Sequence, residues 1–227
     1  MARPVLYPLR SVDTATVRYA TFPHHRRRVT IVHRPLPGIT PAMLLDWFTH
    51  LGGTMRYGGE IVDRYLAWHP IDHIRWQLAK AAPGGGAAEG SRFRIVEAFG
   101  GRPEFRVDVV DRVEKLDETG IRLVQRLAGV VIFQLEHTWS PGPDGAHYVS
   151  VMDVGARSAL MAPVNRVVQR KLPDEMLTAW VKHNIEEVGQ LAYLLPTLGS
   201  GEPEPAQRAQ RGDQAPCGEH QQAEPVH

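Results

Sequence analysis

The feature that most constrains the fold is a change of hydrophobic period along the chain. From Arg92 to Val154, apolar and polar residues alternate in a way that is typical of β-strands with one buried face. From Pro173 to about Leu195, apolar residues recur every three or four positions, which predicts one long helix. Because strands and long helix occupy separate stretches of the chain, we predict an α+β fold in which a curved antiparallel sheet wraps around this helix.

The alternating region divides into several predicted strands. The residues between them are rich in Asp, Gly and Pro, which is typical of hairpin turns. The predicted strands are Arg92–Phe99, Phe105–Leu116, Ile121–Glu136 and Ala146–Val154. Upstream, we predict a short strand over Val29–His33 and a helix with Thr40 as N-cap and Pro41 at its first position. A sheet curved around a helix also leaves room for a ligand pocket between the two.

Composition narrows the class of protein. The chain has 227 residues, of which 43% are hydrophobic, and a formal net charge of +1, so bulk charge favours neither a nucleic-acid nor a membrane partner. Neither a secretory leader nor a membrane-spanning run is visible, and we expect a cytoplasmic protein. The single cysteine, Cys217, excludes a disulfide framework and a cysteine-based metal site. The polar segment 199–227 is predicted to be a disordered tail after one domain over 1–198.

Two polar residues interrupt the apolar face of the C-terminal helix. At about 100° per residue, one stripe of this helix consists of Met176, Trp180, His183, Glu187 and Leu191. A buried carboxylate is costly unless it is paired with a cation, and residues four apart on a helix are neighbours. His183 and Glu187 can therefore share a metal ion. The alternatives are a simple ion pair or a helix rotated toward solvent; Glu186 is predicted to face solvent in this register.

A second concentration of metal-capable side chains lies just beyond residue 64. It consists of Tyr65, Trp68, His69, Asp72, His73 and Trp76. Imidazole is a common ligand of zinc and related ions. Asp72 can orient a histidine from outside the ligand set, or it can cap a helix that begins at His73. The alternative for the segment is a turn kinked at Pro70, with the tryptophans packed on the core.

Strand phase adds a third candidate, Glu97. With a period of two, Glu97 shares a strand face with Phe93, Ile95 and Phe99, which mark that face as the buried one. Together with one histidine of the preceding segment, Glu97 completes a possible four-ligand set of two His and two Glu, which suits zinc, manganese or iron. At this point His69 and His73 are both candidates for the second histidine.

His137 and Tyr148 form a further candidate pair. His137 follows a strongly apolar strand, and antiparallel pairing with the next strand can bring Tyr148 close to it. An ordinary half-buried sheet pair is an equally good interpretation.

These motifs, in this order, resemble the 2,4-diacetylphloroglucinol hydrolase family. The matching features are Tyr-x-x-Trp-His-Pro-x-Asp-His from Tyr65 to His73, then Glu97, His137, and finally His-x-x-x-Glu at His183 and Glu187. The resemblance covers the chain from about Val29 to Leu195. It implies a helix-grip fold similar to START and polyketide-cyclase domains.

The resemblance also implies a ligand set and a reaction. Zinc would be held by His73, Glu97, His183 and Glu187, because the step of eight residues from Tyr65 favours His73; His69 would then be a reserve ligand or lie beside the pocket. The implied reaction is hydrolysis, by metal-activated water, of a carbon–carbon bond between an acyl group and a phenolic ring.

The remaining candidates surround this site. The resemblance loosely matches His137, Tyr65 and Tyr148 to groups that bind phenolic oxygens or move protons. Trp68, Trp76 and Trp180 are predicted to wall an apolar pocket for a small aromatic or polyketide-like molecule.

Two other functions stay open at the level of the sequence. One is a non-catalytic binder of a hydrophobic small molecule, with the same fold and no metal. The other is a different metal-dependent enzyme that acts on polyketide-like compounds. The oligomeric state is open as well, with a homodimer as one option.

Overall fold

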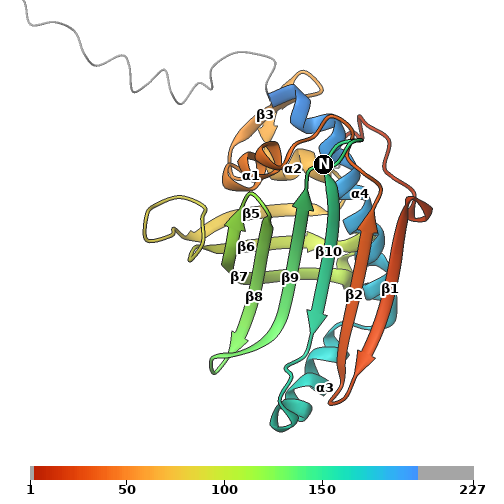
Figure 1. The fold of residues 1–227 in the computed structure, drawn as a ribbon, viewed down its shortest axis with the longest axis vertical. Coiled ribbons are helices and arrows are strands. Elements are labelled where there is room, and N and C mark those ends of the chain that lie inside the picture. Colours follow the sequence, from red (N-terminus) through yellow and green to blue (C-terminus); the bar gives the residue numbers. More distant parts are fainter. Residues whose placement is uncertain (1–2, 199–227) are drawn as a thin grey trace, which may run out of the picture.

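One large antiparallel sheet dominates the protein, for which a computed structural model describes residues 3–198. The eight strands are β1 (Ala15–Phe22), β2 (Arg26–His33), β5 (His73–Lys80), β6 (Arg92–Ala98), β7 (Arg106–Asp117), β8 (Gly120–Leu127), β9 (Val130–Ser140) and β10 (His147–Val154). Their order in the sheet is β1-β2-β10-β9-β8-β7-β6-β5 (Figure 1). The predicted tail, 199–227, lies outside the described residues.

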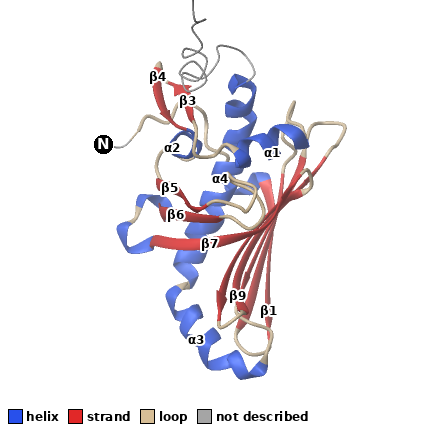
Figure 2. Ribbon diagram, turned by 90° about the vertical axis from the view of Figure 1, so that its left-hand side faces the viewer, coloured by secondary structure: helices blue, strands red, loops and turns tan. Residues whose placement is uncertain are grey.

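The long helix α4 (Asp174–Leu198) lies inside the curve of this sheet. Figure 2 shows β5, β6 and β7 on one side of α4 and strands β9 and β1 on the other. The predicted α+β fold, with a curved antiparallel sheet around a C-terminal helix, is confirmed, and this arrangement is the helix grip. The predicted stripe is also confirmed, because Met176, Trp180, His183, Glu187 and Leu191 are all buried.

Smaller elements close the ends of the sheet. The helices are α1 (Pro41–Thr49), α2 (Arg64–Trp68) and α3 (Ala162–Lys171), a separate hairpin pairs β3 (Thr54–Tyr57) with β4 (Glu60–Asp63), and 3-10 turns cover Val12–Thr14, Phe99–Gly101, Pro103–Phe105 and Ala159–Met161. The cap of α1 is as predicted, since the Thr40 side chain accepts a hydrogen bond from the Met43 amide. Figure 1 shows α1 and α2 near one end of the sheet and α3 near the other.

The predicted single strand over Ile121–Glu136 is wrong. The chain reverses at Ala128 and Gly129, whose φ angles of 48° and 82° are both positive, so β8 and β9 form a hairpin there. Positive φ at both central residues matches the twist of a tight hairpin. A single glycine inside an apolar run was too weak a signal to reveal this turn. Strands β1 and β5 were not predicted either, and most residues of both strands are exposed.

Two apolar clusters hold α4 against the sheet. The first surrounds the later turns of the helix and includes Trp47, Trp68 and Leu191. The second surrounds its earlier turns and includes Phe99, Met152 and Trp180. His183 and Glu187 therefore lie on the part of the helix that joins the two clusters. Among the described helices, none has the length and apolar character that crossing a membrane requires.

Candidate metal centre

Four polar side chains from three elements converge beneath the sheet. His73 begins β5 and is paired in register with Glu97 on β6, while His183 and Glu187 come from α4. His73 Nε2 lies 3.4 Å from Glu97 Oε1 and 3.5 Å from Glu187 Oε2. His183 Nε2 lies 3.8 Å from Glu97 Oε2 and 3.7 Å from Glu187 Oε2. Each imidazole thus faces both carboxylates, and we refer to these residues as the four-residue cluster.

The outer nitrogen of each imidazole in the cluster is already engaged. His73 Nδ1 is 2.6 Å from the Tyr65 carbonyl oxygen, and His183 Nδ1 is 2.9 Å from Asp72 Oδ2. Because both partners accept hydrogen bonds, both Nδ1 atoms carry the proton and the Nε2 lone pairs point inward in the neutral rings. His73 Nε2 is buried and has no hydrogen-bond partner among the residues that the structure describes. This is the usual preparation of histidine for a metal ion, so the residues fit such an ion.

Asp72 holds His183 in place. Its carboxylate accepts hydrogen bonds from the amides of Gly100 at 2.9 Å and Gly101 at 2.8 Å, both of which have a φ of 68°. Burial alone would raise the pKa of Asp72, but its hydrogen bond to His183 and the charges nearby lower it to about 2. Of the two predicted roles for Asp72, the structure has the orienting one, since a strand and not a helix begins at His73.

The two carboxylates are also positioned from outside. The Tyr65 hydroxyl donates to Glu97 Oε1, and its ring stacks on His73 with centroids 3.9 Å apart. Burial and the adjacent Glu97 raise the pKa of Tyr65 well above its usual value, so the hydroxyl keeps its proton. Glu187 Oε1 accepts a hydrogen bond from Asn184 Nδ2 at 2.7 Å. One oxygen of each carboxylate is thus engaged by a neighbouring donor.

The charges of the cluster depend on one another. Burial by itself would lower the pKa of His183, but Glu187, Glu97 and Asp72 outweigh it and raise the pKa to about 9. Burial likewise would raise the pKa of Glu187, but His183 and His73 lower it to about 2. The buried carboxylate of Glu187 and the half-buried one of Glu97 therefore require positive charge between them, which a protonated imidazole or a metal cation can supply.

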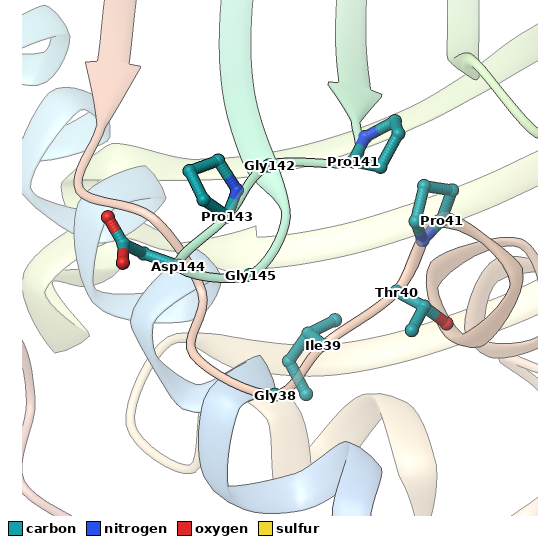
Figure 3. A pocket seen from close by; sticks show the side chains of 9 residues that line it. All are labelled: Gly38, Ile39, Thr40, Pro41, Pro141, Gly142, Pro143, Asp144 and Gly145. Atoms are coloured by element: carbon teal, nitrogen blue, oxygen red, sulfur yellow. The ribbon is translucent and has the colours of Figure 1, made fainter.

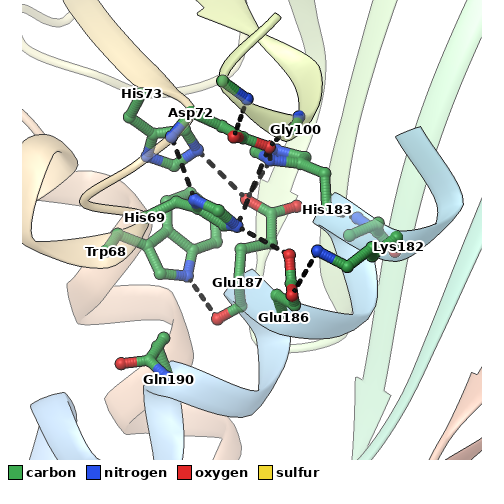
Figure 4. A network of polar contacts seen from close by, with 12 residues as sticks. Trp68, His69, Asp72, His73, Gly100, Lys182, His183, Glu186, Glu187 and Gln190 are labelled. Carbon is green, nitrogen blue, oxygen red and sulfur yellow. Dashed lines mark hydrogen bonds and ion pairs between the residues drawn. The ribbon is translucent and has the colours of Figure 1, made fainter. Parts of the chain in front are cut away.

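His69 lies beside the cluster and not in it (Figure 4). Its Nδ1 accepts a hydrogen bond from the Asp72 amide at 3.1 Å, and its Nε2 lies 3.3 Å from Glu186 Oε2. Glu186, predicted to face solvent, is only 6% exposed and also pairs with Lys182 at 2.9 Å. That prediction was wrong because His69 gives this carboxylate a buried partner. Although His69, Asp72 and His183 are close enough to share an ion, their polar atoms are already engaged. Asp72 Oδ2 is bonded to His183, and the two ring nitrogens of His69 face the Asp72 amide and Glu186.

A cavity of about 580 Å³ lies between the sheet and α4 and reaches the cluster. Glu97, His183 and Glu187 line it, and the polar or aromatic residues predicted around the site that also line it are Tyr65, Trp68, His137 and Trp180. Its exposed lining residues, Arg106 and Lys171 among them, mark its opening near α3. Trp76 does not line this cavity; it packs on Phe93 at a centroid distance of 5.0 Å.

Three buried polar side chains form a hydrogen-bonded chain that leads from His137, on the cavity wall, into the sheet. The Ser150 hydroxyl is 2.9 Å from His137 Nδ1 and 2.9 Å from His33 Nε2. A hydroxyl has one proton, so Ser150 donates to one ring and accepts from the other, and the tautomers of the two histidines are coupled. Burial lowers the pKa of His137 to about 4 and, with His137 nearby, that of His33 to about 3. Tyr148 lies with its ring 5.5 Å from that of His137.

His33 and Ser150 were not predicted as part of the site. The signal was present in the sequence, since Val29, Ile31 and His33 alternate along a predicted strand and place a histidine on its buried face. Ser150 had no comparable signal, because a small hydroxyl residue is common in strands.

A second hollow, of about 470 Å³, lies between the loop before α1 and the β9–β10 turn (Figure 3). Its lining residues are Gly38–Pro41 and Pro141–Gly145. Asp144 is the only ionisable side chain among them. Nothing in this hollow matches the concentration of polar groups at the cluster.

Comparisons with known proteins place the chain only by its overall shape. No family model matches it, and no curated protein matches it significantly. Among similar solved structures are the di-domain ARO/CYC protein BexL from the BE-7585A biosynthetic pathway (TM-score 0.48, 11% identity, 80% of this chain and 52% of that one) and Ms6760 from Mycobacterium smegmatis (0.46, 9%, 79% and 98%). CalU16 from Micromonospora echinospora is another (0.37, 13%, 80% and 97%). At these identities and TM-scores, no activity follows from the likeness.

Proposed function

We propose that this protein is a metal-dependent hydrolase that acts on a small aromatic ketone. The observation that carries the proposal is the pair of inward-facing Nε2 atoms, on His73 and His183, each within 4 Å of both Glu97 and Glu187. A structural ion-pair network has no need to hold both Nδ1 atoms on fixed acceptors, whereas a metal site does.

Zinc is the ion that we propose for the cluster. Two neutral imidazoles and two carboxylates compensate the charge of a divalent ion, and nitrogen and oxygen ligands suit zinc. A zinc ion bound there would supply a Lewis acid for a carbonyl oxygen and a water of lowered pKa. The adjoining cavity, at about 580 Å³, is within the usual range for a small-molecule site.

The reaction that we propose follows the resemblance to the 2,4-diacetylphloroglucinol hydrolase family. Water adds to the acyl carbonyl, the bond from the acyl carbon to the ring breaks, and the ring carbon gains a proton. The products are a carboxylic acid and the deacylated phenol, so one water is consumed and no oxidant or reductant is needed.

His137 is the residue that we assign to proton transfer. Its ring lines the cavity, and because Ser150 engages Nδ1, Nε2 is the nitrogen available to a substrate. The lowered pKa of His137 keeps its ring neutral at physiological pH, so Nε2 can accept a proton. At the same time the hydrogen bonds among Nδ1, Ser150 and His33 can change direction. Tyr65 fixes Glu97, and Tyr148 packs beside His137.

The test combines metal analysis with product analysis. Purified protein should contain about one equivalent of zinc, and His183→Gln and Glu187→Gln should lose it. Glu175→Gln, an exposed carboxylate on the same helix, should keep it. The wild-type protein should convert monoacetylphloroglucinol to acetate and phloroglucinol, and chromatography measures both products. Full zinc occupancy in both cluster variants would overturn the site, and bound zinc without acetate release would overturn the reaction.

A metal-free binder of apolar ligands is the second candidate. The raised pKa of His183 favours it, because an imidazolium can compensate the carboxylates without a metal. Metal-free protein that folds stably and retains an apolar ligand in the cavity would support this candidate.

A further inference from the structure

A second polar position lies in the same cavity, away from the cluster. On β7, Val107, Val109 and Val113 face inward, and Asp111 takes the inward position between the last two. Its side chain is only 3% exposed and lines the cavity. An aspartate among inward valines is costly unless something offsets its burial.

The carboxyl group of Asp111 lacks a full set of partners. Its Oδ1 atom is buried and has no hydrogen-bond partner in the described part of the chain. Gln125, which also lines the cavity, lies beside it on β8, since the neighbouring residues Arg112 and Val124 are paired. On the other side, Asp111 is paired with Phe93 of β6. Within residues 3–198, the side chains that influence the ionisation of Asp111 are Gln125 and Glu97, and neither is a cation.

The separation from the cluster fixes the length of a ligand that reaches both positions. Glu97 is paired with Val107, and Asp111 is four residues further along β7. At the usual rise per residue this is about 13 Å along the strand, less the reach of the two side chains. The wall between them is apolar and includes Ile95 and Val109, which are paired with each other.

We infer that Asp111 and Gln125 form a hydroxyl-recognition site, which takes an extended aromatic ketone carrying a hydroxyl group at the end opposite its carbonyl. The placement of the carbonyl end depends on the proposed function, whereas the placement of the hydroxyl end depends on Asp111 alone. A single substituted ring is too short to span both positions, whereas two or three fused rings are long enough. Because the χ2 torsion of aspartate has broad minima, either carboxyl oxygen can turn to accept the ligand hydroxyl.

The test is a binding comparison between two probes that differ by one hydroxyl. In 6-acetyl-2-naphthol the hydroxyl and acetyl groups lie at opposite ends of the fused rings, and 2-acetylnaphthalene lacks the hydroxyl. Trp68 and Trp180 line the cavity, so quenching of tryptophan fluorescence reports occupancy. Wild-type protein should bind the naphthol about tenfold more tightly, the usual worth of a hydrogen bond to a buried, unpaired acceptor.

Variants assign the preference to Asp111. Asp111→Leu should bind both probes equally, and an apolar residue there should leave the fold intact. Asp111→Asn, which keeps an acceptor oxygen, should retain part of the preference, and the exposed Asp13→Asn should retain all of it.

Equal binding of both probes by the wild type would overturn the inference, and so would an unchanged preference in Asp111→Leu. Neither result involves zinc content or acetate release, so this inference and the hydrolase proposal can fail separately.

Discussion

Two regions of the same cavity each contain a histidine and an acid whose pKa values shift in opposite directions. One region is the four-residue cluster, and the other is the part of the sheet that carries His137 and Asp111, which we call the sheet wall. In the cluster, the pKa of His183 is raised to about 9 and that of Glu187 is lowered to about 2, although burial opposes both shifts. On the sheet wall, burial lowers the pKa of His137 to about 4 and raises that of Asp111 to about 6. Burial alone neutralises a side chain, and only close opposite charges keep it ionised.

This difference separates the two regions by role. The cluster keeps anionic carboxylates inside the protein, which suits the binding of a cation. The sheet wall keeps its histidine uncharged and able to exchange protons, and it presents a carboxyl group to whatever fills the cavity. The predictions below test whether the cluster holds charge for a cation and whether burial favours the neutral forms of His137 and Asp111 on the sheet wall, beginning with the largest effect.

Zinc should stabilise the protein through the cluster. At a free zinc concentration about a thousandfold above Kd, the free energy of unfolding should rise by about 4.1 kcal/mol, or about 8–16 °C in Tm for a domain of this size. Glu187→Gln should show less than half of this shift, and Glu175→Gln should show all of it. Thermal unfolding with and without zinc measures the effect. Equal shifts in both variants would mean that zinc binds elsewhere.

The buried Asp111 should lower the free energy of unfolding at neutral pH. Below pH 4 it is protonated in both states. Between about pH 4 and 6 the unfolded chain loses the proton first, so stability falls, and above pH 6 the penalty is complete at about 3 kcal/mol. Glu97 adds to the shift and Gln125 reduces it. In urea unfolding, the free energy of unfolding of Asp111→Asn should rise by that amount relative to the wild type from pH 4 to 8. Asp13→Asn should show no such rise. A pH-independent difference would show that the pKa of Asp111 is not raised in the fold.

Much of the fold could be predicted because the periodic elements are long. Helical phase placed His183 and Glu187 on the buried stripe, and strand phase placed Glu97 inward. The β8–β9 turn was missed because the turn residues are apolar apart from Gly129. Glu186 was assigned to solvent because its buried partner, His69, is distant in sequence and a helical wheel contains no tertiary partner.

Some residues of the site could likewise be predicted from the sequence, and others could not. Residues on regular elements could be assigned to a face, but the inward turn of each imidazole depends on the Tyr65 carbonyl and on Asp72, which only the folded chain brings into place. Asp111 could have been found, since it breaks a run of inward valines with period two. Ser150 could not, because its importance comes from two histidines on neighbouring strands.

His137 should make the protein sensitive to acid. Its folded pKa of about 4 lies below its usual value of 6.5, so the unfolded chain takes up a proton first and stability falls as the pH drops below 6.5. At pH 5 the loss should be about 2 kcal/mol. The carboxylates of Glu187 and Glu136 partly oppose the shift. His137→Gln should gain this amount on the wild type between pH 7 and 5 in urea unfolding, and exposed His147→Gln should not. No gain for His137→Gln would mean that His137 is charged in the fold.

Ser150→Ala gives the smallest expected effect and the most specific one. It removes the hydroxyl between His33 and His137 and should cost about 1 kcal/mol, compared with no measurable cost for the exposed Ser158→Ala. Nitrogen NMR of the imidazoles carries the argument further. With Ser150 present, a ligand that donates a hydrogen bond to His137 Nε2 forces the ring proton onto Nδ1. The Ser150 hydroxyl must then turn toward His33 and change its tautomer, because one hydroxyl proton serves both rings. Without the hydroxyl, His137 should respond alone. If the tautomer of His33 still changes with that of His137 in Ser150→Ala, the two rings are coupled by electrostatic interaction and not by the hydroxyl. The sheet wall would then resemble the cluster, where charges act on one another directly.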